Sequence, residues 1–382
     1  MRTAPFLVWV CLVTGISALA CSGEDSPVGA ATGGTGGTTN TGGIGGDEPD
    51  PRIPGQMEFE RIRDGFESLE TLAGSGVAGP DTNDWDPSFE GAPATDADLS
   101  TPHNALGDAE GNIFIADKDA HAIRKVAPDG TLTTVAGMNE AGDDGDDPAP
   151  ALESHLNQPN GLWVKPDGTV YILDLGNTKV RRLDPDGTLS TLFADPTLKT
   201  GRGLWVADDE SLAYVCSGTE VLRWDPEMGV TIFSQPFAEL GNLYVDRDGI
   251  VFVTDRGANR IFRVERNGVA SAIAGSGATS GPIDGQLPLE APLNGVRGIW
   301  GAPTGGFFFG THEGNQVLYQ DSTGYFHVLI DGAHGIHTGD GEPLSSPGKK
   351  VSEVRNVTMT PEGALLITEN DLGYIRIARP KP

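Results

Sequence analysis

The chain has 382 residues and a formal net charge of −28, from 26 lysines and arginines against 54 aspartates and glutamates. This length suffices for one large domain or two ordinary domains with a full hydrophobic core. Nucleic acids and anionic membrane surfaces are bound by basic surfaces, so the charge argues against both as partners. Apart from 54 glycines, the composition is that of a soluble globular protein.

The first 20 residues predict an export signal. Arg2 precedes an apolar run from Phe6 to Ala20 that is too short and ends too abruptly for a spanning helix. The ending "SALAC" resembles the lipobox of bacterial lipoproteins, which implies that Cys21 becomes a lipid-modified N-terminus, and Ser22 favours the outer membrane or cell surface. The alternative is an ordinary cleaved signal peptide and a periplasmic or extracellular protein.

Residues 21–51 are predicted to be a flexible linker. The stretch "VGAATGGTGGTTNTGGIGGDEPDP" holds almost no bulky apolar side chain, so it cannot bury enough surface to offset its chain entropy. Membrane contact is therefore expected through the lipid anchor only. Cys216 is the one cysteine left beyond the N-terminal segment, so no disulfide can hold the folded part together, and we expect it to be a small buried strand residue.

An internal repeat dominates the rest of the chain. The stretch "NIFIADKDAHAIRKVAPDGTLTTVAG" from Asn112 returns from Thr169, from Ile250 and, more loosely, from Gly306, with two weaker copies in the gaps. Each copy predicts four short strands joined by Asp-Gly and Gly-Asn turns. A four-stranded sheet cannot cover both of its faces alone, whereas several sheets packed around an axis can. The predicted fold class is all-β, a six-bladed β-propeller over residues 65–378.

The N-terminal strand is expected to close the ring. The last copy stops after three strands, and "SLETLAGSG" from Ser68 is an outer strand with no blade of its own. The repeated text, a strand ending in Asp, then "GN", "(I/V)R", "DPDG" and "T(L/V)(S/T)T", resembles the NHL repeat family. That resemblance implies the propeller and says almost nothing about function, since propellers host many activities.

The repeated charges are interpreted as framework. The second strands end at Asp117, Asp174, Cys216, Asp255, Thr311 and Glu369, with Arg124, Arg181, Arg223 and Phe262 or Arg263 shortly after. An enzyme needs a catalytic group once, whereas this pair of a carboxylate and an arginine recurs in several of the repeats. Each Asp is expected to accept backbone N–H groups in the turn between second and third strands, with the Arg as a partner between strands. His121 is then a turn residue.

Four insertions separate the repeats, at residues 74–100, 138–157, 276–293 and 333–353. All join an outer strand to the next inner strand, so they share one face and predict a crescent-shaped wall around the channel mouth, open beside the third blade. Leu99, Leu156 and Leu293 are expected to anchor the insertions on their blades.

The starts of the inner strands are the candidate ligand-binding residues. Aligning them gives one ring at the channel mouth, consisting of Asn104, Asn160, Arg202, Gly241, Arg297 and Arg355, with His103 beside it. One interpretation is a pocket for a carboxylate, phosphate or acidic sugar, with Arg supplying paired hydrogen bonds. The other is that each Arg pairs with a second-strand Asp or Glu and holds adjacent blades together.

Two groups of side chains on the same face are candidate metal sites, with calcium or zinc as the possible cofactor. Asp143, Asp144, Asp146 and Asp147 could hold calcium or form a solvated acidic turn. Several histidines map to this face, and "HGIHTGDGE" pairs two of them near carboxylates. The histidines concerned are His103, His155, His312, His334 and His337.

Two functions follow. The first is a binding or scaffold module that recognises a protein, peptide, glycan or small anion. The second is a metal-dependent hydrolase or lyase acting at the channel mouth, as in six-bladed calcium lactonases and the zinc-dependent peptide-amidating lyase. The lactonase type needs carboxylates where this ring has arginines, and the lyase type needs several channel histidines, of which His103 alone is suitably placed. No catalytic residue is predicted.

Overall fold

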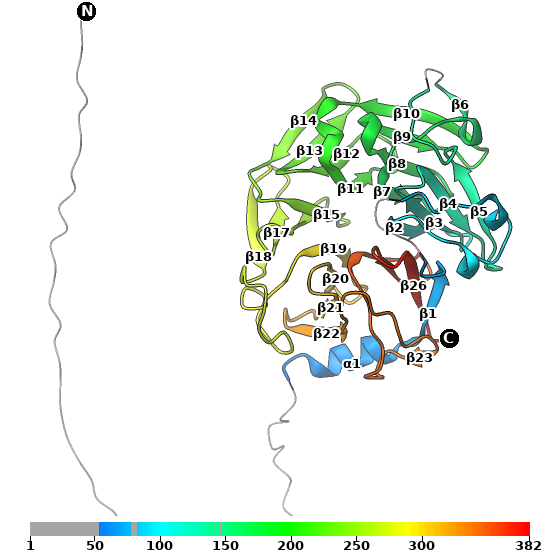
Figure 1. The fold of residues 1–382 in the computed structure, drawn as a ribbon. Coiled ribbons are helices and arrows are strands. Elements are labelled where there is room, and N and C mark those ends of the chain that lie inside the picture. The colour runs from blue at the N-terminus through cyan, green and yellow to red at the C-terminus, as the bar shows by residue number, and fades with distance from the viewer. Residues whose placement is uncertain (1–52, 78–81, 145–146) are drawn as a thin grey trace, which may run out of the picture. The chain divides into compact units, whose positions relative to one another are not determined.

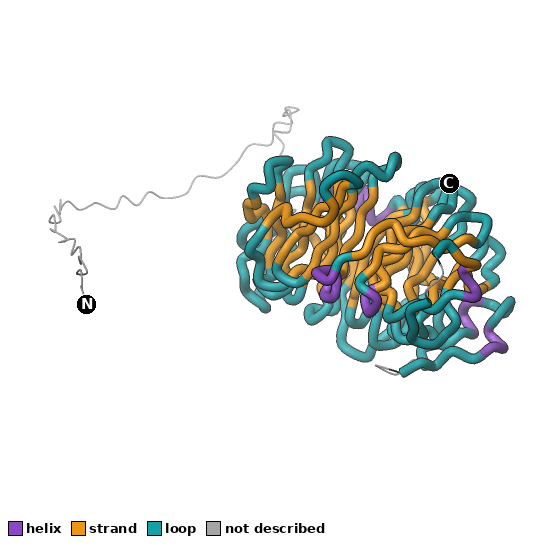
Figure 2. The backbone as a smooth tube through the Cα atoms, turned by 90° about the horizontal axis from the view of Figure 1, so that it is seen from above, coloured by secondary structure: helices purple, strands orange, loops and turns teal. Residues whose placement is uncertain are grey.

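The computed structural model describes residues 53–77, 82–144 and 147–382, so the predicted signal peptide, Cys21 and the linker lie outside the described residues. The described part contains six antiparallel sheets arranged in a ring, which confirms the six-bladed β-propeller (Figure 1). In the view turned by 90°, the strands lie in the middle of the molecule and the loops lie on both of its faces (Figure 2).

Each blade is a meander in which the first strand lies at the channel and the last at the periphery. Blades one to three are β2 (Pro102–Gly107), β3 (Ile113–Asp117), β4 (Ala122–Val126) and β5 (Leu132–Ala136); β7 (Pro159–Val164), β8 (Val170–Asp174), β9 (Lys179–Leu183) and β10 (Thr188–Ala194); and β11 (Gly201–Val206), β12 (Ala213–Ser217), β13 (Glu220–Asp225) and β14 (Gly229–Ser234). Blades four and five are β15 (Leu240–Val245), β16 (Val251–Asp255), β17 (Arg260–Val264) and β18 (Ala270–Ala274); and β19 (Val296–Gly301), β20 (Phe307–Thr311), β21 (Gln316–Gln320) and β22 (Phe326–Ile330).

The sixth blade joins the two ends of the folded region, as the orphan strand predicted. It consists of β24 (Val354–Met359), β25 (Leu365–Glu369) and β26 (Tyr374–Pro380), completed by β1 (Phe66–Ala73) from the start of the fold. Leu69 pairs with Ala378 across this closure, and both side chains are fully buried. The ring is therefore closed by pairing of the first strand of the fold, β1, with its last strand, β26.

Helix α1 (Gln56–Asp64) precedes the closing strand and was not predicted. Its buried Phe59 stacks on His327 of β22 with ring centroids 4.7 Å apart, and Glu58 accepts a 2.6 Å hydrogen bond from the Tyr319 hydroxyl of β21. The helix thus packs against blade five (Figure 1). No helix among the described residues is long and apolar enough to cross a bilayer.

The hydrophobic cores lie between neighbouring blades, because each sheet buries both faces against the next. Phe114 and Ile123 of blade one, for example, pack with Leu162 and Ile172 of blade two in one cluster. The predicted anchors of the insertions, Leu99, Leu156 and Leu293, are all fully buried in such clusters. That part of the interpretation is confirmed.

The insertions lie further from the channel than predicted. Each runs along the outer strand of the blade that follows it and adds a short edge there. Two insertions form short strands, β6 (Ala149–Pro150) paired with β10 and β23 (Glu342–Pro343) paired with β1. The first insertion contacts β5 through a β-bridge between Pro93 and Thr131. The third contacts β22 through a 2.8 Å hydrogen bond from Gly285 N to Phe326 O. The outer strands of blades three and four carry no insertion, since the connections before them are short.

The second-strand carboxylates do accept backbone N–H groups, but from a different segment than expected. Asp117 accepts from Ser100 N at 2.6 Å, and Glu369 from Ser352 N at 2.9 Å. These donors end the connection before the inner strand; among the matching positions, Asp255 also accepts from its own turn, from Ala258 N at 3.1 Å. In blade three the position belongs to Ser217 rather than Cys216, which is fully buried one residue earlier.

Three buried arginines pair with these carboxylates, and we call Arg124, Arg181 and Arg376 the framework arginines. Arg124 donates to Asp117 at 2.9 Å and stacks over the Trp85 ring of the first insertion. Arg376 lies 3.3 Å from Glu369 and donates to Asp340 of the last insertion at 2.6 Å. The predicted Arg223 and Arg263 instead lie on the surface, beside Asp225 and Glu265. The repeated pairs therefore fasten the insertions to the blades.

Candidate functional site

The channel mouth lies on the face where inner strands begin and where second strands turn into third strands. In strand register, the second residue of each inner strand occupies the same position in every blade: His103, Asn160, Arg202, Gly241, Arg297 and Arg355. The sequence alignment had put Asn104 in this ring. Asn104 lies one step further along β2, where its side-chain oxygen accepts from Asn356 Nδ2 at 2.8 Å.

A cavity of about 530 Å³ opens at this mouth. Four predicted ligand-binding residues line it, namely His103, Asn160, Arg202 and Arg355. Arg297 is not among the lining residues, but its charge lowers the pKa of both His103 and Arg256. None of the cavity's lining residues belongs to the four insertions, and Thr101 directly follows the first of them, so the predicted insertion wall does not form the cavity. The other lining residues are Lys118, Leu175, Lys199, Thr200, Gly201, Gly218, Glu239 and Asn370.

Several residues of the mouth were missed at the sequence level, and they share a position. Lys118, Gly218 and Asn370 line the cavity, and each is the first residue after a second strand. Arg256, which was also missed, and His312, which the sequence places on this face, occupy the same position in blades four and five. Because this turn and the start of the inner strand share one face, the position could have been derived from the repeat once the strands were counted.

The mouth arginines, Arg202, Arg297 and Arg355, do not pair with second-strand carboxylates as one interpretation proposed. Arg202 lies 3.5 Å from Glu239 Oε1, and Arg297 lies 3.3 Å from Glu313 Oε1. Both glutamates belong to connecting segments. Arg355 contacts the side-chain oxygen of Asn370 and no carboxylate in the described part of the chain. Glu239 is shared with Arg256 and Arg355 has no carboxylate, so cations outnumber carboxylates at the mouth.

Several donors of these guanidinium groups are left over. The Nε atoms of Arg297 and Arg355 are buried and have no hydrogen-bond partner among the described residues, and the same holds for Arg256. Arg297 is only 6% exposed. Burial, reinforced by the charges of Arg297 and Arg202, lowers the pKa of Arg256 to about 10, so it is still charged at neutral pH. Buried donors without partners cost free energy unless a ligand or water accepts from them.

His103 is a neutral donor or acceptor at the mouth. Its Nδ1 lies 2.7 Å from Asn160 Oδ1, which fixes the proton on Nδ1 because that oxygen can only accept. Burial lowers the pKa of His103 to about 3, and the nearby Lys118, Arg202 and Arg297 act in the same direction. The imidazole therefore stays uncharged throughout the physiological pH range, with Nε2 as an acceptor.

The acidic partner of Arg297 stays ionised. Burial acts to raise the pKa of Glu313, but the adjacent His312 side chain and the charge of Arg297 outweigh it and lower that pKa to about 2. Glu239 plays the matching role between Arg202 and Arg256, both of which contact its Oε1. The mouth thus holds fixed charges of both signs, with cations in excess.

The predicted acidic and histidine clusters are distributed over separate contacts. Asp143 contacts Lys179, Asp144 lies 2.8 Å from His155 Nδ1, and Asp147 accepts from Thr191 N at 2.9 Å, while residue 146 lies outside the described residues. His337 lies 3.2 Å from Glu369 and stacks on Tyr374, away from the contacts of His334. No group of three metal-ligating side chains in the described part includes the four predicted aspartates.

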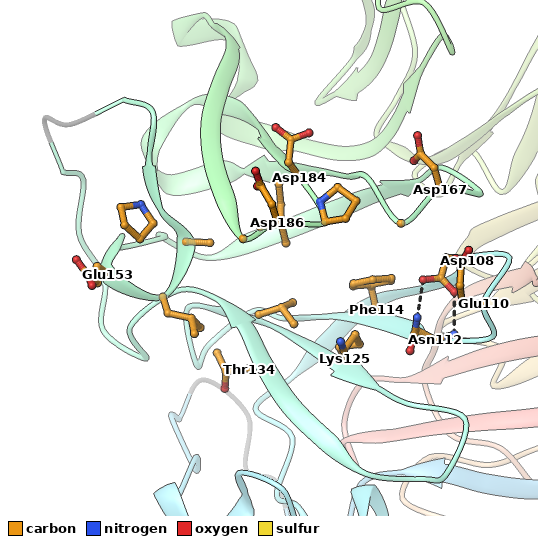
Figure 3. A pocket seen from close by; sticks show the side chains of 18 residues that line it. Asp108, Glu110, Asn112, Phe114, Lys125, Thr134, Glu153, Asp167, Asp184 and Asp186 are labelled. Atoms are coloured by element: carbon orange, nitrogen blue, oxygen red, sulfur yellow. Dashed lines mark hydrogen bonds between the residues drawn. The ribbon is translucent and has the colours of Figure 1, made fainter.

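A larger cavity of about 660 Å³ lies between blades one and two, and we call it the lateral cleft (Figure 3). Asp167, Asp184 and Asp186 line one side of it, and Asp108 and Glu110 another (Figure 3). These carboxylates serve turns: Asp186 accepts from Thr188 N at 2.9 Å and Asp108 from Asn112 N at 2.8 Å. Since equivalent turn aspartates recur around the ring, the lateral cleft is a product of the repeat, and the mouth is the stronger candidate site.

No protein-family model matches the chain. Curated relatives include Teneurin-3 of Danio rerio, 37% identical over 177 residues (41% of this chain, 6% of the relative), and Teneurin-3 of Mus musculus, 34% identical over 105 residues (24% and 4%). The chain spans less than a tenth of the length of these relatives.

Solved structures share the fold at low sequence identity. A Bacteroides thetaiotaomicron structural genomics protein of unknown function superposes with a TM-score of 0.63 at 15% identity (82% of this chain, 76% of that chain). An auxiliary nutrient binding protein of Bacteroides ovatus gives 0.60 at 12% (83% and 78%), and a streptogramin B lyase gives 0.53 at 13% (84% and 99%). At these identities the chain is similar to a binding protein and to a lyase in fold alone.

Proposed function

We propose that the protein is an exported, lipid-anchored NHL-repeat propeller that binds a small anionic ligand, such as a sugar acid or a phosphate, at the channel mouth. One observation carries the proposal: Arg202 and Arg355 line a cavity of about 530 Å³ in a chain of net charge −28, Arg297 lies in the same ring of inner-strand residues, and Arg355 has no carboxylate partner in the described part. Like charges gathered at one mouth cost free energy, which an anion would offset.

The donor set suits a carboxylate or phosphate. Guanidinium groups supply planar pairs of N–H donors that match the oxygens of both groups. Asn160 and the Nε2 atom of His103 add a neutral donor and acceptor for hydroxyl groups of the same ligand. The combination of charged and neutral polar groups favours an acidic sugar over a bare inorganic anion.

The same charges argue against a metal-dependent hydrolase or lyase at this mouth. A divalent cation placed beside Arg202, Arg297 and Arg256 would be repelled. That Bacteroides propellers of this fold are auxiliary nutrient binding proteins supports a binding role, although the likeness concerns the fold.

Thermal unfolding with matched ligand pairs tests the proposal. We expect glucuronate and phosphate to raise the unfolding midpoint in a concentration-dependent way, and glucose at the same concentrations to leave it unchanged. An equal shift with glucose, or no shift with any anion, would contradict the proposal. Release of the intact protein from membranes by detergent, and its loss from the membrane fraction on Cys21→Ser, tests the anchor separately.

A further inference from the structure

A second cluster of polar side chains lies on the mouth face, between the last insertion and blade six. It consists of His334, Glu353 and Asp371, and we call it the rim cluster. His334 Nδ1 lies 3.1 Å from Glu353 Oε1 and 3.4 Å from Asp371 Oδ2. Within the described residues it is the one group of three metal-ligating side chains whose ligand atoms all lie within 4.8 Å of one another.

The spacing of these atoms fits coordination of one ion. Zinc binds imidazole nitrogen and carboxylate oxygen at about 2.0–2.2 Å, so neighbouring ligands of a tetrahedral site lie about 3.3–3.5 Å apart. The 3.1 Å and 3.4 Å separations around His334 Nδ1 are close to that edge length. The carboxylate ligand atoms of Glu353 and Asp371 lie within 4.8 Å of each other, so the three atoms can share a cation once these two oxygens move closer together.

The two carboxylates are already held in place. Asp371 Oδ2 accepts from Ser352 Oγ at 2.5 Å and from Gly335 N at 3.3 Å. The backbone N–H of Glu353 donates to Asn315 Oδ1 at 2.8 Å. Asp371 Oδ1 is buried and has no hydrogen-bond partner among the described residues, which leaves an acceptor available. The side chains of Asp371 and Glu353 are 14% and 24% exposed and that of His334 is 72% exposed, so an ion can enter from the His334 side.

His312 supports the other oxygen of Glu353. Its Nε2 lies 3.0 Å from Glu353 Oε2, and its Nδ1 lies 3.5 Å from Glu313 Oε1. A ligating carboxylate whose second oxygen contacts another side chain is typical of the groups that surround bound metals. His312 also connects the rim cluster to Glu313, the partner of Arg297 at the mouth.

We propose that the rim cluster binds one first-row divalent cation, with His334, Glu353 and Asp371 as protein ligands and water in the remaining positions. One imidazole and two carboxylates suit Zn²⁺ best, Mn²⁺ less well and Ca²⁺ least, because calcium prefers an all-oxygen shell. The ion would fasten the last insertion, which supplies His334 and Glu353, to the turn after β25, which supplies Asp371. The site does not depend on an anion at the mouth.

Calorimetric titration of the intact, chelator-treated protein tests this proposal. We expect Zn²⁺ alone to bind with one ion per chain, Mn²⁺ to bind at least tenfold more weakly, and Ca²⁺ to bind more weakly still. His334→Ala and Asp371→Asn should each weaken Zn²⁺ binding at least tenfold. His334 is largely exposed, so its removal should leave the unfolding midpoint of the metal-free protein unchanged.

His155→Ala is the matched control, because among the described residues His155 contacts one carboxylate, that of Asp144, in another insertion. It should leave Zn²⁺ binding unchanged. Absence of stoichiometric Zn²⁺ binding, or binding that survives both His334→Ala and Asp371→Asn, would overturn the proposal. Because these titrations contain no anionic ligand, their failure would leave the proposed anion site untouched.

Discussion

The chain holds two sets of arginines and partners them differently. The framework arginine Arg124 is fully buried against Asp117 at 2.9 Å, and Arg376 is fully buried near Glu369 and Asp340. The mouth arginines have fewer carboxylates than charges: Arg202 shares Glu239 with Arg256, Arg297 lies 3.3 Å from Glu313, and Arg355 contacts an amide oxygen. The framework set matches its charges within the fold, whereas the mouth set leaves charge available. Removing a member of the first set should therefore cost stability, and removing a member of the second should cost binding.

The largest expected effect is on stability, from Arg124→Met. This change leaves Asp117 buried without its ion pair and removes the stack on Trp85, so we expect the free energy of unfolding to fall by about 3–5 kcal/mol. Urea denaturation measures this, and glucuronate affinity of the folded variant should not change. Arg223→Met is the control, because that side chain is 44% exposed and 3.7 Å from Asp225; it should cost less than about 1 kcal/mol. Loss of glucuronate binding by folded Arg124→Met would break the comparison.

The second effect concerns the weakest framework pair, in which Arg181 lies 3.7 Å from Asp174. Burial raises the pKa of Asp174 to about 6 from 3.8, although hydrogen bonds from Asn157 and Asn177 oppose it. A raised carboxyl pKa contributes stability that is fully present below about pH 4 and is lost as pH rises through about 6. Relative to Asp174→Asn, the wild type should lose about 3 kcal/mol of unfolding free energy over that range. Urea denaturation at several pH values measures the difference, and a flat difference would contradict it.

The third effect is on binding, from Arg355→Gln. A charged hydrogen bond contributes about 1.5–3 kcal/mol, so glucuronate affinity should fall about tenfold to hundredfold. Stability should change by less than about 1 kcal/mol, because no carboxylate loses its partner. Arg355→Lys should recover only part of the affinity, since an ammonium group lacks the planar pair of donors. Calorimetry measures both variants, and full affinity in Arg355→Gln would remove Arg355 from the site.

The smallest expected effect is that of pH on anion affinity. With pKa values of about 3 and about 2, His103 and Glu313 keep their charge states between about pH 5 and about pH 8. Sulfate does not titrate in that range, so His103→Gln should leave the shape of the pH profile of sulfate affinity unchanged within about twofold. A midpoint near pH 6 that is lost in His103→Gln would show that His103 is charged there.

The fold could be predicted from the sequence because the same four-strand pattern recurs in successive copies of the repeat. The same repetition exposed the framework pairs, yet Arg376, which occupies the position of Arg124 in the third strand of the last copy, was missed because that copy resembles the others only weakly. Helix α1 was missed because it lies outside the repeat and buries one residue, Phe59.

The site could be predicted only in part. Asn104 and Asn160 were aligned with each other because they are the same residue type. The register of the strand pairs instead puts His103 at the position in blade one that Asn160 occupies in blade two. The rim cluster could not be derived, since the path of the last insertion decides that His334 reaches Asp371 while His337 turns toward Glu369.

Calorimetric titration of glucuronate into the wild type and the Arg202→Gln/Arg297→Gln double variant decides whether the mouth arginines bind an anion. We expect one bound ligand per chain in the wild type and no measurable binding in the double variant, with both proteins folded. Equal binding by the two proteins, or no binding by the wild type to glucuronate, phosphate or sulfate, would contradict it.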